Sequence, residues 1–588
     1  MDQERVWSGQ AVAPGIGLGP AFLLRRERKT VQRSEIADIE LELARLDKAI
    51  ERARAMLELH RKRAARRFGD VVARIFDTHL MILEDEPAFD EIRELIRTES
   101  VSAQFAAFKI LDNYARHFEK QEDTYFRDRA QDVRDVCRRL VGQLDGEDDT
   151  VLSDIPDEPC VLLAAELNPT DILRLPQDQI IAVATDAGGA TSHTAILTRT
   201  LGVPSVVGLR DITTSVQRGD IVVINGNSGK VVLHPNPDQL ARYERKHREY
   251  KEFVKSLEDI RDQRAETTDG HSVLLNSNIE MPSEAAAVLR NGSDGVGLFR
   301  TEYLVLTHGG LPDEEMQYNA YRNVIIALEG RPITFRTFDL GGDKAFPGAG
   351  IPVENNPFLG WRAIRVGLDR PEMMKPQLRA IFRAAVHGPA KLMFPMISTL
   401  EELYRAKEVL QDVLAELEAD GIEYSHEVPV GMMVEVPSSA LLASRFAPHV
   451  DFFSIGTNDL VQFTMAVDRG NEQVAGLHQP FNPAVLNLIK MTVDAGRMAQ
   501  IPVSMCGEMA GQPLGTLLLL GLGLDELSTS PSLVPEVKKL VISSTLAEAR
   551  KLAEESLRLD TAPQVRAHLL EYMKSRFKNL PIWFEPGT

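Results

Sequence analysis

The chain has 588 residues and a formal net charge of −19 at pH 7, and 44% of its residues are hydrophobic. Such acidity argues against nucleic acid or an anionic membrane surface as the main partner. The three cysteines are scattered, so they indicate neither a disulfide framework nor a zinc site. We find no secretory leader and no apolar run of membrane-spanning length, and therefore expect a cytoplasmic protein without membrane insertion.

The first part of the sequence predicts two short strands followed by several helices. Ser8–Leu24 is apolar and glycine-rich, with a turn at Pro14–Gly15. From Ile36 onward, apolar residues recur in steps of three and four, which is typical of a helix that packs against other helices. Further helical patterns cover residues 71–86, 91–97, 102–122 and 125–144. We therefore expect residues 35–144 to form an all-helical bundle.

Strand-like segments resume after this region and indicate an α/β domain. They cover residues 160–163, 180–184, 205–207, 221–224 and 231–233, with a hairpin turn at Asn225–Gly229. We expect the early strands to complete the same sheet, so that the helical bundle is inserted in a discontinuous domain of residues 1–34 and 145–235. The charged segment of residues 236–266 predicts a linker helix between domains.

A histidine follows one of these strands. The stretch from Gly188 to Ile196 reads GGATSHTAI and leads into a helical pattern. The glycine pair permits unusual backbone conformations, and free N–H groups at the start of a helix favour an anion. Neutral imidazole is a nucleophile near physiological pH, so His193 is a candidate carrier of a phosphoryl group. The alternative is a capped histidine in a turn.

Strand and helix patterns alternate through the rest of the sequence. The strand candidates cover residues 273–278, 295–299, 333–338, 392–395, 430–435, 452–455, 503–505 and 526–528. This alternation predicts a (β/α)8 barrel for residues 267–588, with its chemistry at the carboxyl ends of the strands. The chain as a whole is thus predicted to be a multidomain α/β protein.

Polar residues that packing does not require lie at several of these strand ends. Arginines, carboxylates and a thiol are expected to converge at one mouth, namely Arg300, Arg336, Arg469, Glu435, Asp459 and Cys506. Arginine forks bind carboxylate and phosphate groups, and a pair of carboxylates suits Mg²⁺. The pocket is predicted to take a small, highly anionic, metal-chelating molecule, and phosphoenolpyruvate fits this description.

The same residues also have plain structural interpretations. Cys506 would be a buried filler, and Glu435 a solvated carboxylate at a strand end. The arginines would make ordinary surface ion pairs with nearby carboxylates, Arg300 with Glu302 and Arg336 with Asp339. The functional interpretation rests on the shared position of these residues at predicted strand ends.

The assembled motifs resemble those of the Enzyme I family, the phosphoenolpyruvate–protein phosphotransferases of the bacterial sugar phosphotransferase system. The resemblance covers nearly the whole chain. The matching stretches, in family order, are HLMILEDE (79–86), RDRAQDVRD (127–135), GGATSHTAI (188–196), GVGLFRTEYL (295–304), RTFDLGGDK (336–344), NNPFLGWRAIR (355–365), EVP (435–437), SIGTNDLVQ (454–462) and MCGE (505–508).

This resemblance implies a role for each matching residue. His193 would carry the phosphoryl group, and Cys506 would protonate the enolate on the way to pyruvate. Glu435 and Asp459 would ligate Mg²⁺. Phosphoenolpyruvate would be held by Arg300, Arg336, Asn458, Asp459 and Arg469. The helical insertion would bind the phosphocarrier protein HPr, and the barrel would form a homodimer.

Three other functions are weighed against this one. A nitrogen-branch phosphotransferase enzyme shares the machinery, and Ala190 stands where sugar-type members often carry a basic residue. Pyruvate phosphate dikinase and phosphoenolpyruvate synthase share the histidine and the barrel, but they need a nucleotide-binding domain, and the insertion shows no glycine-rich phosphate loop. A non-catalytic sensor of phosphoenolpyruvate would not need His193, Cys506 and the metal pair together.

Overall fold

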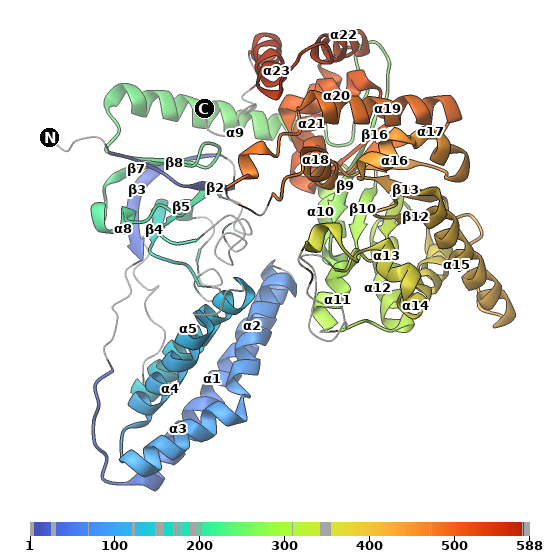
Figure 1. Ribbon diagram of the computed structural model, residues 1–588. Helices are drawn as coiled ribbons and strands as arrows, with labels where there is room; N and C mark the ends of the chain where they lie inside the picture. The colour runs from blue at the N-terminus through green and yellow to red at the C-terminus, as the bar shows by residue number, and fades with distance from the viewer. Residues whose placement is uncertain are drawn as a thin grey trace. The chain divides into compact units, whose positions relative to one another are not determined.

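The protein is described by a computed structural model that covers residues 5–580 apart from 14, 25–30, 69, 120–123, 147–157, 169–170, 172–174, 177–178, 189–197, 199–202, 309, 342–353, 355, 470, 472 and 579. The chain folds into two compact units that divide between Lys251 and Glu252. Each unit has its own sheet, one open and one closed into a barrel (Figure 1).

The first unit is built on an eight-stranded sheet with the order β1-β8-β7-β3-β4-β5-β6-β2. Strands β3 to β6 run parallel, and the remaining pairs are antiparallel. The strands are β1 (Arg5–Ser8), β2 (Gln10–Ala13), β3 (Ile16–Leu24), β4 (Cys160–Ala164), β5 (Ile180–Thr185), β6 (Ser205–Val207), β7 (Ile221–Asn225) and β8 (Lys230–Leu233). The early strands do complete this sheet, as predicted, and β1 is an additional edge strand.

The parallel neighbours β3 and β4 are separated in sequence by five helices. These are α1 (Ile39–Phe68), α2 (Asp70–Leu83), α3 (Glu86–Glu99), α4 (Ala103–Glu119) and α5 (Thr124–Asp145). The apolar seam predicted from Ile36 onward is buried at Leu46, Ala53 and Leu57, none of which is exposed to solvent. One hydrophobic cluster joins this seam to Leu162 on β4, so the helices and the sheet share a core.

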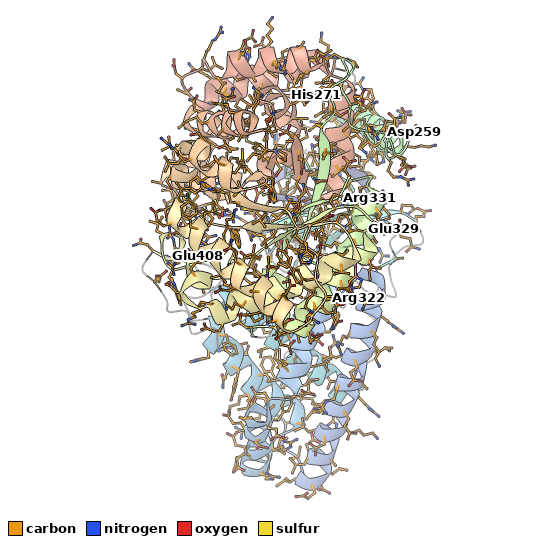
Figure 2. The ribbon with its side chains drawn as sticks, turned by 90° about the vertical axis from the view of Figure 1, so that its right-hand side faces the viewer. Asp259, His271, Arg322, Glu329, Arg331 and Glu408 are labelled. Atoms are coloured by element: carbon orange, nitrogen blue, oxygen red, sulfur yellow. The ribbon has the colours of Figure 1, made fainter. Side chains whose placement is uncertain are left out.

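The charged helix after the sheet, α9 (Pro237–Glu258), ends well before residue 266, where the sequence placed its end. In the turn that follows, the buried Lys538 ammonium donates to the Arg261 carbonyl at 2.6 Å. Figure 2 labels Asp259 and His271 at the two ends of this turning segment. A further short helix in the described part of the first unit is α8 (Ile212–Ser215).

The second unit is a closed barrel of parallel strands, as the sequence predicted (Figure 1). The strands are β9 (Leu274–Ile279), β10 (Val296–Arg300), β11 (Ile333–Arg336), β12 (Ala390–Phe394), β13 (Val430–Val434), β14 (Phe453–Ile455), β15 (Val503–Met505) and β16 (Glu526–Thr529), and β16 pairs with β9 to close the ring. All carboxyl ends therefore lie on one rim. The interior is filled by Leu298, Met393, Met433, Phe452 and Cys506.

Helices surround the barrel, and Figure 2 labels Arg322 on α12 and Glu408 on α15 among them. They are α10 (Ala285–Arg290), α11 (Glu302–His308), α12 (Glu314–Ala327), α13 (Ile364–Asp369), α14 (Pro371–Ala384), α15 (Leu400–Ala419), α16 (Pro437–Leu441), α17 (Ala443–Phe446), α18 (Thr457–Met465), α19 (Pro483–Ala499), α20 (Thr516–Leu522), α21 (Val534–Ile542), α22 (Leu546–Ser556) and α23 (Ala562–Arg576). Within the described part of the chain, no helix has the length and apolar character needed to span a bilayer.

Candidate active site

The barrel rim gathers the polar side chains that the sequence placed at strand ends. Arg300 and Arg336 are the last residues of neighbouring strands β10 and β11. Glu435 directly follows β13, and Cys506 directly follows β15. Asn458 and Asp459 lie in the first turn of α18, just beyond β14. Parallel strands bring these positions to one end of the barrel.

A buried chain of alternating charges crosses this rim. Arg336 Nη2 donates to Glu302 Oε1 at 2.9 Å, and Arg336 Nη1 lies 3.4 Å from Asp339 Oδ2. Arg362 Nη2 donates to Asp339 Oδ2 at 2.9 Å and to Asp459 Oδ2 at 3.2 Å. The side chains of Arg362 and Asp339 are 2% and 1% exposed. Such forked contacts fix the orientation of each guanidinium group.

This network corrects two ion-pair interpretations made from the sequence, the surface pair of Arg336 with Asp339 and the pair of Arg300 with Glu302. Arg336 and Asp339 do approach each other, but they are buried and not at the surface. Arg300 pairs with Glu280, at 2.7 Å, and Glu302 instead accepts from Arg336. The pairing differs because β10 ends at Arg300, whereas Glu302 begins α11 and also accepts the Asp339 backbone N–H at 2.8 Å.

Arg362 was not identified from the sequence, although it lies in one of the quoted motifs. It is 23 residues from Asp339 and 97 from Asp459, so no local spacing pattern connects them. Burial lowers its pKa, but Asp339 and Asp459 outweigh this effect and the net pKa is raised. Arg362 therefore stays charged between two aspartates.

Glu435 is a buried carboxylate, which overturns its interpretation as a solvated group at a strand end. It is 2% exposed, and its Oε1 accepts the Met396 backbone N–H at 2.6 Å. Burial raises its pKa to about 8, and the charges of Asp459 and Asp339 add to this rise against the two arginines. Glu435 and Asp459 are thus close enough to repel each other, and a bound cation would relieve that repulsion.

The donor set at this point fits a hard divalent cation. Carboxylate oxygens are the ligands that Mg²⁺ prefers, and it is commonly held by one or two of them while substrate oxygens and water complete its shell. Among the described residues, no group of three or more His, Cys, Asp or Glu side chains is arranged to hold a metal by itself. Two carboxylates would leave most of the shell of such a cation to substrate oxygens and water.

Cys506 lies inside the barrel just below this rim. It is 3% exposed, and it packs in the apolar cluster with Met393 and Met433. Burial raises the pKa of its thiol, while the Ser454 hydroxyl and Arg336 act in the opposite direction. The Cys506 side chain thus packs with the apolar side chains of the barrel interior. Its thiol is also a protonated group next to the charged site.

The open side of the rim carries the remaining predicted residues. Asn458 Nδ2 donates to Glu508 Oε1 at 3.0 Å, and Asn458 Oδ1 accepts from the Glu508 backbone N–H at 3.0 Å. Arg469 Nη1 lies 3.8 Å from the same Glu508 oxygen. Its side chain is 40% exposed. The rim is therefore charged on both its buried and its solvent side.

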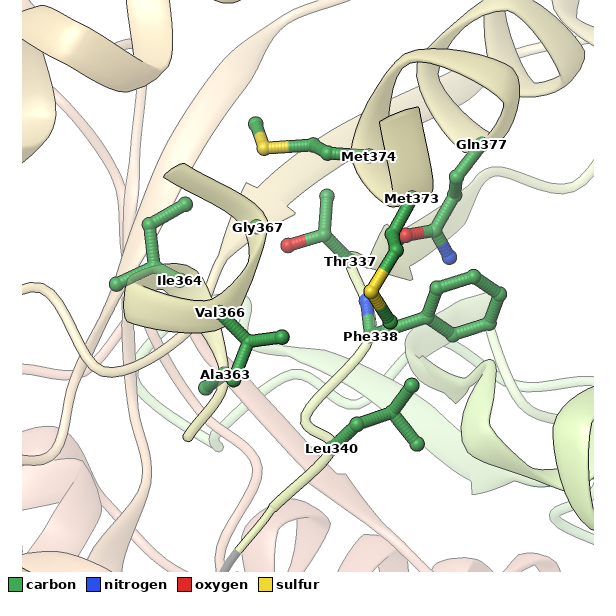
Figure 3. A pocket seen from close by; sticks show the side chains of 10 residues that line it. All are labelled: Thr337, Phe338, Leu340, Ala363, Ile364, Val366, Gly367, Met373, Met374 and Gln377. Atoms are coloured by element: carbon green, nitrogen blue, oxygen red, sulfur yellow. The ribbon is translucent and has the colours of Figure 1, made fainter. Parts of the chain in front are cut away.

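An apolar pocket lies directly behind the ion-pair network and supports it (Figure 3). Phe338 and Leu340, which flank Asp339, face Met373 and Met374 of α14 across this pocket. Gln377 accepts the Phe338 backbone N–H at 2.9 Å and donates to Thr301 Oγ1 at 3.0 Å. Packing and hydrogen bonds on this side therefore hold the backbone that presents Asp339.

The backbone next to Arg362 adopts an unusual conformation. Ala363 has φ 53° and ψ −125°, and its N–H donates to the Leu340 carbonyl at 2.8 Å. Gly341 faces this turn, and a Cβ at Gly341 would lie 2.5 Å from the Trp361 carbonyl oxygen. The close approach of these two loops sets the direction in which Arg362 leaves the backbone.

His193 and the rest of GGATSHTAI after Gly188 lie outside the described residues, and so does the alternative of a capped histidine in a turn. Before these residues, the described part of the chain runs to Gly188, just after β5. Asp186 follows β5, and its Oδ1 accepts the Thr213 backbone N–H at 3.2 Å. Gly188 has φ 107°, a conformation that favours glycine.

Comparison with known families assigns the chain to a class. Models of phosphoenolpyruvate-utilising enzymes match three consecutive parts: the N-terminal domain over residues 8–129, the mobile domain over 156–229 and the PEP-binding domain over 254–546. The last of these spans the rim residues described above. The fold and these matches define a phosphoenolpyruvate-utilising enzyme.

Individual relatives narrow this class to one family. The chain is 41% identical to the phosphoenolpyruvate-protein phosphotransferase of Listeria monocytogenes, over 95% of this chain and 97% of the relative. It is 39% identical to the Bacillus subtilis protein of the same name, over 96% and 99% of the two chains. A solution structure of Enzyme I, 35% identical, covers 42% of this chain and 99% of its own length with a TM-score of 0.36. The chain belongs to the phosphoenolpyruvate-protein phosphotransferase family.

Proposed function

We propose that the chain transfers the phosphoryl group of phosphoenolpyruvate to His193 and from there to the phosphocarrier protein HPr, with release of pyruvate. The observation that carries this proposal is the buried chain Glu302–Arg336–Asp339–Arg362–Asp459 at the rim of the PEP-binding barrel. It fixes two guanidinium groups among three carboxylates, with Glu435 nearby, in a water-poor site where charge–charge interactions are strong.

Phosphoenolpyruvate carries a phosphate and a carboxylate, and the rim offers partners for both. We assign Arg336 and Arg362, together with Arg300, to the phosphate. Asn458 and Arg469 lie together on the open side and are assigned to the carboxylate, with Asp459 adding a backbone contact. Phosphoryl transfer depends mainly on positioning and charge neutralisation, which is what fixed arginines supply.

Glu435 and Asp459 are the proposed ligands of Mg²⁺. When bound, the ion would neutralise charge on the substrate oxygens during transfer. The carboxylates themselves suit this role because Glu435 is buried and lies near Asp459, and both effects raise its pKa.

The residues of the chain divide the reaction into two steps. The bond between phosphorus and the enol oxygen breaks as a bond forms to an imidazole nitrogen of His193, and the electron pair stays on the enol oxygen. The methylene carbon of the resulting enolate then takes the proton of the Cys506 thiol, which yields pyruvate. Burial favours the protonated thiol before this step, and water returns the proton afterwards.

HPr is the proposed acceptor, and the helical region between β3 and β4 is its proposed docking surface. Exposed apolar side chains are present there on two helices that pack together: Leu59 on α1 is 47% exposed and Met81 on α2 is 59% exposed. The identity of the carrier determines whether a sugar or a nitrogen branch is served. Phosphate relay from labelled phosphoenolpyruvate to purified carriers decides between them.

A homodimer through the barrel is also proposed. Leu441 and Leu442 at the end of α16 and Met491 and Met498 on α19 are between 42% and 83% exposed, and α16 packs against α19. Apolar side chains gathered on one face favour association with a second copy. Sedimentation of the Met498→Glu variant tests this: a shift from dimer toward monomer supports the surface, and an unchanged dimer excludes it.

Incubation of the full chain with labelled phosphoenolpyruvate and Mg²⁺ tests the proposed function. An acid-labile phosphoprotein that passes its label to HPr is the expected result. Phosphorylation of pyruvate from ATP would instead place the chain with the dikinases, and the described insertion, which is helical, gives no support for that activity.

A further inference from the structure

The groups assigned to the ligand on the open side of the rim are held by two exposed glutamates. Glu508 accepts from Asn458 Nδ2 at 3.0 Å and lies 3.8 Å from Arg469, and Glu280 accepts from Arg300 Nη1 at 2.7 Å. The side chains of Glu508 and Glu280 are 75% and 53% exposed. These exposures set them apart from the carboxylates that hold Arg336, which are at most 7% exposed.

We propose that Glu508 and Glu280 are internal surrogates for the anionic groups of the ligand. Before the ligand binds, the two glutamates occupy Asn458, Arg469 and Arg300. On binding, the anionic groups of the ligand displace them. This inference rests on the proposed function of the rim. It assigns a positioning and selecting role to two residues that would not themselves contact the reacting atoms.

The contacts of Glu508 imitate those expected of a ligand carboxylate. One of its oxygens faces both an amide N–H₂ group and a guanidinium group, the two donors assigned to the carboxylate of phosphoenolpyruvate. Glu280 likewise occupies a guanidinium nitrogen that is assigned to the phosphate. A donor hydrogen can serve only one strong acceptor at a time, so the ligand and the glutamate compete for it.

A backbone hydrogen bond beside each glutamate does not involve its carboxylate and can persist when the side chain leaves. The Glu508 backbone N–H donates to Asn458 Oδ1 at 3.0 Å, which keeps the amide oriented when the carboxylate moves away. The Glu280 backbone N–H donates to Glu284 Oε2 at 2.7 Å, which anchors its main chain. Both side chains already face solvent, so displacement returns each carboxylate to water at little cost.

This exchange selects for ligands that carry two anionic groups. Phosphoenolpyruvate replaces both glutamates, because its carboxylate and its phosphate each take one set of donors. Pyruvate has lost the phosphoryl group and replaces only Glu508. The ion pair between Arg300 and Glu280 therefore stays in place. The return of the glutamates would therefore favour release of the product over retention.

The test is the affinity of the full chain for phosphoenolpyruvate in the presence of Mg²⁺, measured by titration calorimetry for wild type, Glu508→Gln, Glu280→Gln and the double variant. Glutamine keeps the size and one acceptor but loses the charge. Each single variant is expected to lower Kd about two- to fivefold, which is the range of an exposed ion pair. The double variant is expected to show roughly the product of the two effects, since the residues hold different donors.

Glu427→Gln is the matched control, because Glu427 is an exposed glutamate that precedes β13 at the opposite end of that strand from the rim. Its affinity should equal that of wild type, and the gain in the other variants should shrink at high salt. Unchanged or weaker binding by Glu508→Gln and Glu280→Gln, with normal melting temperatures, overturns the inference while the proposed function stands. Failure of the wild-type chain to bind phosphoenolpyruvate overturns both.

Discussion

Arg362 holds Asp339 through two nitrogens, with Nη2 at 2.9 Å from one oxygen and Nε at 3.1 Å from the other, although 23 residues separate them in the chain. Both side chains are almost fully buried. The same guanidinium group reaches Asp459, which is the proposed metal ligand. One arginine thus connects the loop after β11 to the start of α18, and the proposed phosphate site depends on its geometry.

Replacement of Arg362 by lysine should weaken phosphoenolpyruvate binding. Lysine retains the charge but cannot reach two aspartates through a rigid fork. We expect KM to rise about tenfold to a hundredfold, which corresponds to the loss of one charged hydrogen bond. Steady-state kinetics measure this effect. Arg365→Lys is the matched control, because Arg365 lies on the same segment and contacts the Gly360 carbonyl at 3.1 Å; an equal change in both variants would contradict the assignment.

Replacement of Glu435 by glutamine should separate metal binding from folding. The pKa of Glu435 is raised to about 8, so the neutral form is favoured at pH 7 and glutamine imitates it. We expect a melting temperature without Mg²⁺ that is equal to or higher than that of wild type, together with loss of the stabilisation that Mg²⁺ and phosphoenolpyruvate give the wild-type protein. Thermal melts with and without the ion measure both. An undiminished Mg²⁺ effect in the variant would remove Glu435 as a ligand.

Replacement of Cys506 by alanine should separate the two chemical steps. In the proposed reaction, phosphorylation of His193 does not require the thiol, whereas protonation of the enolate carbon does. We expect pyruvate formation to slow by about a hundredfold, in line with the loss of a positioned acid, while a single round of protein phosphorylation persists. Cys137→Ala is the control, because Cys137 is a buried cysteine of the helical region. Equal pyruvate formation by the Cys506 variant and wild type would exclude the thiol as the donor.

Asp269 provides a prediction about stability and pH that is independent of the active site. Its carboxylate accepts from Thr267 Oγ1 at 2.6 Å and from the backbone N–H groups of Leu546 and Ala547 at the start of α22. These hydrogen bonds lower its pKa to about 2. A lowered folded-state pKa stabilises the protein above the unfolded-state value of about 3.9, and this contribution is lost as the pH falls toward 2.

The Asp269→Asn variant should therefore melt at a lower temperature than wild type at pH 7, and the difference should shrink as the pH falls below about 4. Calorimetric melts across this range measure it. Asp560→Asn, at an exposed aspartate before α23, serves as the control. A difference that is constant with pH would mean that the charge of Asp269 is not responsible.

The sequence predicted the barrel strands well because most of them are short, largely apolar runs between helical patterns, as at Val503–Met505, where the predicted and observed strands have the same bounds. It also placed polar residues correctly at the ends of those strands, because topology alone brings the carboxyl ends of parallel strands together. The early end of α9 at Glu258 was not predicted, and the turn after it includes a hydrogen bond from Lys538, far along the chain, that no local pattern indicates.

Pairing between charged side chains was the weaker part of the prediction. Proximity in sequence suggested Arg300 with Glu302, yet each has a partner on another strand end. Apart from its place in a motif, no feature of the sequence marked Arg362 as a site residue, because its partners lie in distant segments. The burial of Glu435 could not be inferred either, since a carboxylate just beyond a strand is equally compatible with solvent.

The most direct measurement is the transfer of label from [³²P]phosphoenolpyruvate to the full chain and to its His193→Ala variant, in the presence of Mg²⁺. If His193 carries the phosphoryl group, the wild-type chain takes up acid-labile label, the variant takes up none, and pyruvate forms in an amount equal to the label. Label retained by the variant, or a wild-type chain that takes up none, would contradict that role.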